Sequence, residues 1–223
     1  MGEIEEVEFG DPLILAQFSL DELRSFCREA KNHFGSRLAG LEARSKSVSP
    51  EDEESDYLAD QVEDVQGLLD LAEYFGAIGA YRIFEIFLRS VVDQLRAKGF
   101  IEGKTERYLN PLKDQFKKIG VRLTQPPFRW QEIKKLQTIR NCIVHSDGWV
   151  DSQDVCKLRD YTLRVDDGGE SPLRLPSSYF LEASQLAAET CELVTEKCRG
   201  ARRQRRHWWT RLSSWLLRSV WKR

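Results

Sequence analysis

The sequence predicts an all-α fold, a bundle of helices with a small β-hairpin inserted before its last core helix. Two observations lead to this prediction. Apolar residues recur every three or four positions over most of the chain, as they do on the buried face of a helix. The segment 159–176 instead alternates apolar and polar residues around an Asp-Asp-Gly-Gly turn, which is typical of two short strands. The composition, 41% hydrophobic and 31% charged, is that of a soluble globular domain.

A first helix is expected over about residues 19–44. Ser19 and Glu22 have the spacing of a capping box, in which two side chains bond the free backbone N–H groups at a helix start. The apolar residues that follow keep helical spacing. A break comes next, and Pro50 with the acidic residues behind it marks a new helix, because negative charge is favourable at a helix N-terminus.

The longest helical pattern runs from residue 51 to residue 98 and contains two glycines. Gly76 and Gly79 each weaken a helix interior by about 1 kcal/mol relative to alanine. The pattern is therefore interpreted as two helices, 51–75 and 77–98, with a bend or a close helix contact at the glycines. The second has one broad apolar face and is the expected central core helix. Its expected core residues are Tyr81, Phe84, Leu88, Val91, Val92 and Leu95.

Three further helices are expected at about 105–119, 130–145 and 178–198, with the hairpin between the last two. A basic amphipathic helix then closes the chain. The predicted organisation is an acidic N-terminal segment (1–18), one helical domain (19–198) and a basic, tryptophan-rich tail (199–223).

The net charge of −2 hides two oppositely charged parts. Residues 199–223 hold nine Arg and Lys and no Asp or Glu, so the first 198 residues carry 25 basic against 36 acidic side chains. An acidic body repels polyanions, and any nucleic-acid contact needs a local cleft or the tail. The acidic N-terminus lacks a secretory signal pattern, and the five cysteines form no CxxC pair. These features predict a cytoplasmic protein with neither a disulfide framework nor a zinc site.

The sequence RNCIVH ends the helix expected at 130–145. On a helical wheel Arg140 projects into the apolar arc, where a charge is costly unless it is paired, lines a cleft or meets another subunit. Asn141 and His145 share the neighbouring polar face. Arg140 and His145 lie about 140° apart, so they converge only through long side-chain reach, a loosened helix end or a second copy of the motif. A structural interpretation pairs Arg140 with Glu85 and makes His145 a helix C-terminal cap.

The pattern R-N-x-x-x-H at the end of a late helix, in an all-α chain with the earlier helix AYRIFEIFLRSVVDQL, resembles the HEPN superfamily (higher eukaryotes and prokaryotes nucleotide-binding domains). The hallmark of that family is an Arg, four to six residues and a His, often with a polar residue directly after the Arg. Here these positions are Arg140, Asn141 and His145. The resemblance covers about residues 20–198 and leaves the tail outside.

The resemblance implies a homodimeric bundle in which two motifs line one cleft of a metal-independent, cofactor-free endoribonuclease. It also suggests a toxin or defence effector, restrained by an antitoxin or regulatory partner. A histidine suits this reaction because imidazole titrates near neutral pH and can take the proton of a ribose 2′-OH. An arginine can stabilise the charge that develops on the phosphate. Asn141 would orient His145 or bond the phosphate, and Glu85 would hold Arg140 in position. The alternative is a non-catalytic HEPN-like interaction or regulatory module.

The tail, RGARRQRRHWWTRLSSWLLRSVWKR, gathers its large apolar residues on one face of a helix, with cationic residues opposite. Three interpretations are open. The tail docks on this protein or a partner, lies on an anionic membrane and tethers the protein to the inner face, or binds RNA through arginine and tryptophan. The residues expected to carry such binding are Arg202, Arg203, Arg205, Arg206, Trp208, Trp209 and Trp215.

Overall fold

The structure is a computed structural model that describes residues 10–104, 106, 108–146, 148–150, 158–161 and 171–220. For residues 10, 11, 171 and 202–220 it describes the backbone alone. The described secondary structure is almost entirely helical, which confirms the all-α fold class. Within these ranges no helix combines the length and the apolar character needed to cross a lipid bilayer.

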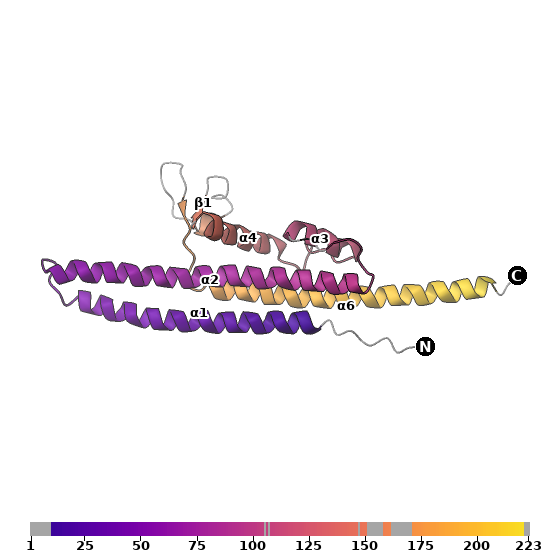
Figure 1. Ribbon diagram of the computed structural model, residues 1–223, viewed down its shortest axis with the longest axis horizontal. Coiled ribbons are helices and arrows are strands. Elements are labelled where there is room, and N and C mark those ends of the chain that lie inside the picture. The colour runs from indigo at the N-terminus through magenta and orange to yellow at the C-terminus, as the bar shows by residue number, and fades with distance from the viewer. Residues whose placement is uncertain are drawn as a thin grey trace. The chain divides into compact units, whose positions relative to one another are not determined.

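Long helices dominate the described part of the chain (Figure 1). The α-helices are α1 (Gly10–Ser45), α2 (Glu53–Ala97), α3 (Leu109–Lys118), α4 (Trp130–His145) and α6 (Tyr179–Val220). A single 3-10 turn, η1 (Arg159–Tyr161), precedes α6. Two short strands, β1 (Trp149–Val150) and β2 (Ser171–Pro172), pair antiparallel, with Trp149 opposite Pro172 and Val150 opposite Ser171.

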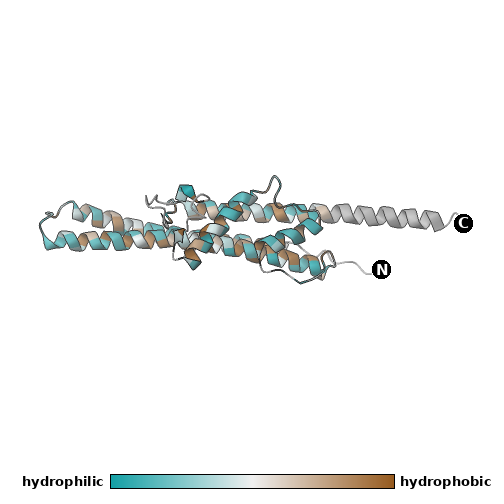
Figure 2. Ribbon diagram, turned by 90° about the horizontal axis from the view of Figure 1, so that it is seen from above, coloured by the Kyte–Doolittle hydropathy of each residue, from teal (hydrophilic) through white to brown (hydrophobic). Residues whose placement is uncertain are grey.

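The helices contribute to two compact units. Unit 1 comprises Met1–Ala16, Glu85–Trp130 and Glu189–Arg223, and unit 2 comprises Gln17–Phe84 and Gln131–Ala188. Hydrophobic and hydrophilic residues alternate around the helices (Figure 2), as expected where each helix buries one face. All six residues predicted for the core of the 77–98 segment are buried, at 4% exposure or less.

In unit 2 a buried carboxylate links three helices. α1 and α2 run in opposite directions (Figure 1), and the Lys31 ammonium of α1 pairs with Glu73 Oε1 of α2 at 2.8 Å. Glu73 Oε2 accepts the Phe180 N–H at 2.9 Å, in the first turn of α6. The first N–H groups of a helix have no partner within the helix and favour negative charge. Glu73, only 3% exposed, therefore caps α6 from another helix.

Gly76 lies one turn after Glu73 and explains why α2 is not interrupted at its glycines. A Cβ at Gly76 would collide with Phe180 Cβ, and a Cβ at Gly79 would lie 2.8 Å from Leu23 Cδ1. The two glycines thus allow neighbouring helices to approach, as the sequence suggested, but they do not bend the chain enough to end a helix. The predicted division into 51–75 and 77–98 is wrong, because close packing offsets the intrinsic weakness of glycine.

In unit 1 most of the buried residues come from α2, α3 and α6. The short helix α3 buries one apolar face, and the adjoining part of α6 buries Cys191, Val194 and Cys198. Burial raises the pKa of the Cys198 thiol to about 12, as expected for a cysteine that serves as a small apolar core residue. The buried aromatic and aliphatic side chains of α2 and α3 in this core include Phe87, Leu88, Leu95, Leu109, Leu112 and Phe116.

The ends of two helices differ from the prediction. α1 begins at Gly10, so the Ser19 capping box lies inside the helix. Pro12 is compatible with the earlier start, because proline in the first helical turn removes an N–H that has no partner. α6 continues past residue 198 to Val220, so the backbone of the tail is helical up to that residue.

The hairpin expected at 159–176 differs as well. Tyr161, predicted to open its first arm, belongs to η1, and residues 162–170 lie outside the described residues. β2 pairs with β1, the segment directly after α4. The physical reason is the turn at Gly148, whose carbonyl accepts the Leu173 N–H at 2.7 Å and starts this pairing.

Candidate functional site

Arg140, Asn141 and His145 meet at the C-terminal end of α4 in unit 2. One nitrogen of the guanidinium, Arg140 Nη1, lies 2.9 Å from Asn141 Oδ1 and 3.2 Å from His145 Nε2. Asn141 and His145 are exposed and Arg140 is half-buried. The three side chains of the R-N-x-x-x-H pattern therefore form one accessible cluster within a single chain.

The structure shows how Arg140 and His145 converge. The buried residues of α4 include Ile133, Leu136 and Ile139, and Arg140 is half-buried, whereas Val144 is 43% exposed. The long arginine side chain contacts Asn141, the neighbour at i+1, and reaches the imidazole at i+5, which is the first of the three ways expected from the sequence. A second chain is not needed to bring the two groups together.

The contact between Arg140 and His145 has only one possible donor. Arginine has no acceptor atom, so a hydrogen bond between the two groups runs from Nη1 to His145 Nε2. This bond requires the tautomer of His145 with its proton on Nδ1. The Nε2 lone pair is then directed at a cation that phosphate can also bind.

The turn after His145 is held by hydrogen bonds that sequence analysis did not find. The Cys142 carbonyl accepts the N–H groups of Ser146 at 3.0 Å and Gly148 at 3.1 Å. Gly148 has a φ of 83°, a conformation that favours glycine. Tyr74 of α2 then donates its hydroxyl to the Leu173 carbonyl at 2.6 Å. This chain of bonds fixes the end of α4 to the β1–β2 pair and to α2.

Tyr74 is suited to this anchoring role. Burial, reinforced by the carboxylate of Asp70, raises the pKa of Tyr74 above its ordinary value of 10.0. The hydroxyl therefore keeps its proton over the whole neutral range and can donate. Nothing in the sequence singles out Tyr74, because its partner is a backbone carbonyl 99 residues away.

The other predicted site residues are placed differently. Glu85 Oε1 pairs with Arg89 Nη2 at 3.0 Å, one turn along α2 in unit 1, and its role toward Arg140 stays a prediction. The seven tail residues, Arg202, Arg203, Arg205, Arg206, Trp208, Trp209 and Trp215, have side chains that lie outside the described residues.

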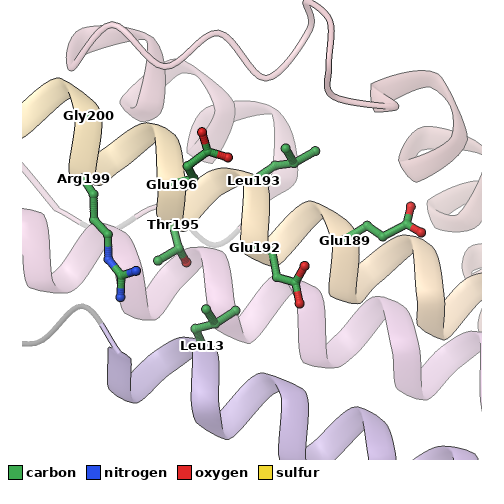
Figure 3. A pocket seen from close by; sticks show the side chains of 8 residues that line it. All are labelled: Leu13, Glu189, Glu192, Leu193, Thr195, Glu196, Arg199 and Gly200. Carbon is green, nitrogen blue, oxygen red and sulfur yellow. The ribbon is translucent and has the colours of Figure 1, made fainter.

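A groove of about 760 Å³ in unit 1 is lined by other residues (Figure 3). Leu13 of α1 borders it, and α6 supplies the rest of the lining, including Glu189, Glu192, Glu196 and the cation Arg199. Three carboxylates against one guanidinium make the lining acidic, which is unfavourable for the phosphates of a nucleic acid. The cluster at the end of α4 is the better candidate for a polyanion.

Among the described side chains, no group of three or more His, Cys, Asp and Glu is arranged to hold a metal ion. Comparisons of this chain with protein-family models, with curated proteins and with solved structures found no match.

Proposed function

We propose that the protein is an endoribonuclease with a HEPN-like fold, whose active site is formed by Arg140, Asn141 and His145 and whose reaction needs no metal. The observation that supports this most is the contact of one guanidinium nitrogen with both Asn141 Oδ1 and His145 Nε2 on accessible surface. A purely structural arginine would be expected to pair with a carboxylate. Among the described residues its partners are an amide and an imidazole, which carry no negative charge, so its own charge remains available to a phosphate.

The proposed reaction is an internal transfer at phosphorus. His145 Nε2 takes the proton of a ribose 2′-OH, and the 2′ oxygen attacks the adjacent phosphorus. The bond from phosphorus to the 5′ oxygen breaks, and that oxygen receives the proton from the His145 imidazolium, which returns to its neutral form. Arg140 donates to the non-bridging oxygens as their charge grows. Asn141, whose Oδ1 accepts from Arg140 Nη1, orients the guanidinium. The products are a 2′,3′-cyclic phosphate and a 5′-hydroxyl, and the substrate must be RNA.

The experiment that tests this proposal is incubation of the purified full chain with mixed cellular RNA in EDTA. Cleavage that survives chelation, and that His145→Ala and Arg140→Ala each reduce at least 100-fold, is the expected result, since general acid–base catalysis alone contributes about 10²–10⁴-fold. DNA and 2′-O-methyl RNA of the same sequence should stay intact. RNA that remains intact with the wild-type chain refutes the proposal.

Matched controls exist on α1. His33 and Arg37 are an exposed histidine and an exposed arginine four residues apart. His33→Ala and Arg37→Ala remove the same residue types from the surface, and both variants should cleave as the wild type does. Loss of activity in these variants would indicate that total charge, and not the α4 cluster, controls cleavage.

The proposal includes a homodimer in which two R-N-x-x-x-H motifs share one cleft. Because Arg140 and His145 already meet within one chain, each chain would supply its own pair. Light scattering should then give twice the 25.9 kDa mass of the chain. Mixing the inactive Arg140→Ala and His145→Ala variants should restore little activity. Partial recovery, from the one intact site that each mixed dimer would then contain, would indicate that the two residues act across the interface.

The proposed biological role is that of a toxin or defence effector in the cytoplasm, held inactive by an antitoxin or another regulatory partner. Induced expression of the wild-type chain should arrest growth, and expression of His145→Ala should not. Equal growth arrest by the wild-type chain and by His145→Ala would show that toxicity does not depend on RNA cleavage.

The second candidate is a non-catalytic module whose basic helix lies on an anionic membrane. It is favoured by the course of α6, which stays helical through the tail to Val220, since such amphipathic helices bind at the headgroup region. The full chain should sediment with anionic vesicles, and replacement of Trp208, Trp209 and Trp215 by alanine should abolish this. Equal sedimentation of the wild-type chain and the triple-alanine variant with the vesicles would refute the membrane proposal.

A further inference from the structure

Trp149 is a large aromatic side chain on the surface beside the proposed active site. It is 46% exposed, whereas the next residue of β1, Val150, is fully buried. Successive residues of a strand point to opposite faces. The burial of Val150 therefore fixes Trp149 on the solvent side, and its exposure follows from the register of the β1–β2 pair.

The backbone of Trp149 is held in place on both sides. Its N–H donates to the Ser146 carbonyl at 2.7 Å, and across the strand pair it lies opposite Pro172. The preceding carbonyl, that of Gly148, accepts the Leu173 N–H, and Leu173 is bonded in turn to Tyr74 of α2. An aromatic ring on such a fixed backbone presents a binding surface with little conformational entropy to lose.

The same hydrogen bonds place Trp149 close to His145. A bond from the N–H of residue i+3 to the carbonyl of residue i keeps the two Cα atoms within about 7 Å, and one more residue adds about 3.8 Å. The Cα atoms of Trp149 and His145 are thus within about 11 Å of each other. Asn141, Val144, His145 and Ser146 are exposed as well, so the cluster and Trp149 are both open to solvent.

We propose that Trp149 stacks on an unpaired base of the RNA whose phosphate is held at Arg140 and His145, so that this site selects single-stranded RNA. The inference rests on the proposed function, because the stacked base belongs to the strand bound at the cluster. A base in a duplex has both faces covered by its neighbours, whereas a base in a loop or single strand is free to stack on an aromatic side chain. Stacking depends little on base identity, so the preference is for strandedness and not for sequence.

The test uses the full chain with His145→Ala, which binds RNA without cleaving it. Fluorescence anisotropy measures the affinity for a short labelled single-stranded RNA. Adding Trp149→Ala should weaken binding about 5- to 150-fold, because stacking contributes about 1–3 kcal/mol per base. Adding Trp149→Phe should recover most of the loss. Phe75→Ala, which removes another exposed aromatic residue of unit 2, is the control and should leave binding unchanged.

Two further readouts separate stacking from charge and from misfolding. Trp149→Ala should leave the slope of log Kd against log salt unchanged, whereas Arg140→Ala should reduce it by about 1, the effect of one lost phosphate contact. An RNA with abasic nucleotides should bind the His145→Ala chain and the His145→Ala/Trp149→Ala chain equally. A blunt duplex should bind both weakly.

Equal binding of the single-stranded RNA with and without Trp149 overturns the inference. If the wild type cleaves RNA and Trp149→Ala does so with unchanged KM, the stacking inference is wrong while the proposed function stands. If no chain cleaves RNA but Trp149 still controls binding, the proposed function is wrong and the stacking surface stands.

Discussion

Replacement of Glu73 by alanine tests whether a buried carboxylate holds the helices of unit 2 together. The change removes the acceptor of the Phe180 N–H at the start of α6 and the anion that pairs with Lys31. A charge-assisted hydrogen bond contributes about 1.5–3 kcal/mol. The ion pair adds about 1 kcal/mol, since the Lys31 side chain is 23% exposed and can turn to water. Release of a buried charge offsets part of the loss.

The expected loss is therefore about 2–4 kcal/mol of unfolding free energy. Urea unfolding followed by circular dichroism at constant pH measures it, with an unchanged slope against denaturant as the sign that only stability has changed. Glu73→Gln keeps an oxygen for the Phe180 N–H and should lose only about half as much. A double-mutant cycle with Lys31→Met should give a coupling energy of about 1 kcal/mol.

The control is Asp21→Asn, which breaks the ion pair with Arg24 at a side chain that is 69% exposed. This change should alter stability by less than about 0.5 kcal/mol. If Glu73→Ala also stays within that limit, the idea that Glu73 caps α6 is refuted. If Glu73→Gln is as damaging as Glu73→Ala, the charge matters and the hydrogen bond does not.

Three more predictions concern unit 2. Gly76→Ala should lower the free energy of unfolding by about 1–3 kcal/mol, because the added methyl group collides with Phe180. A Cβ at Gly67 meets no atom within 4 Å, so Gly67→Ala should raise the free energy of unfolding by about 0.5–1 kcal/mol in the same assay. Burial raises the pKa of Cys27 to about 11, so its contribution to stability is complete below pH 9.0 and falls as pH rises toward 11. Between pH 9.0 and pH 11 the free energy of unfolding of the wild type should fall by about 2 kcal/mol more than that of Cys27→Ala. If the free energies of unfolding of the two proteins run parallel over this pH range, the raised pKa of Cys27 is refuted. Tyr74→Phe should cost about 1 kcal/mol and speed hydrogen exchange at the β1–β2 pair, and unchanged exchange there would show that the hydroxyl is not the anchor.

The course of the helices was largely predictable, because apolar spacing carries that information directly. The helix at 130–145 was predicted with the bounds that α4 has, and the six core residues predicted around Phe84 and Leu88 are all buried, although Phe87 of the same core was missed. The helix ends were less predictable. At Gly76 the sequence could not reveal that a neighbouring Phe180 makes use of the missing side chain, and so a local weakness was interpreted as a break.

The sequence pattern names the three residues of the α4 cluster, but it leaves open which of three ways brings Arg140 and His145 together. The wheel treats every side chain as a direction from the helix axis, which holds for short residues and fails for arginine. Arg140 extends along the surface and reaches His145 in spite of the angle between them. The hydrogen bonds that fix the site through Gly148 and Tyr74 join a turn to distant backbone, and no local pattern in the sequence encodes such partners.

The contact between Arg140 and His145 has a consequence for the resting protein. A lone pair that accepts a hydrogen bond from a guanidinium cannot at the same time take a proton from a hydroxyl. In the proposed reaction the RNA phosphate must first draw Arg140 toward itself, and only then does Nε2 become free. The base would thus be switched on by the backbone of its own substrate, and a water molecule or a small alcohol without an adjacent phosphate would find it already occupied.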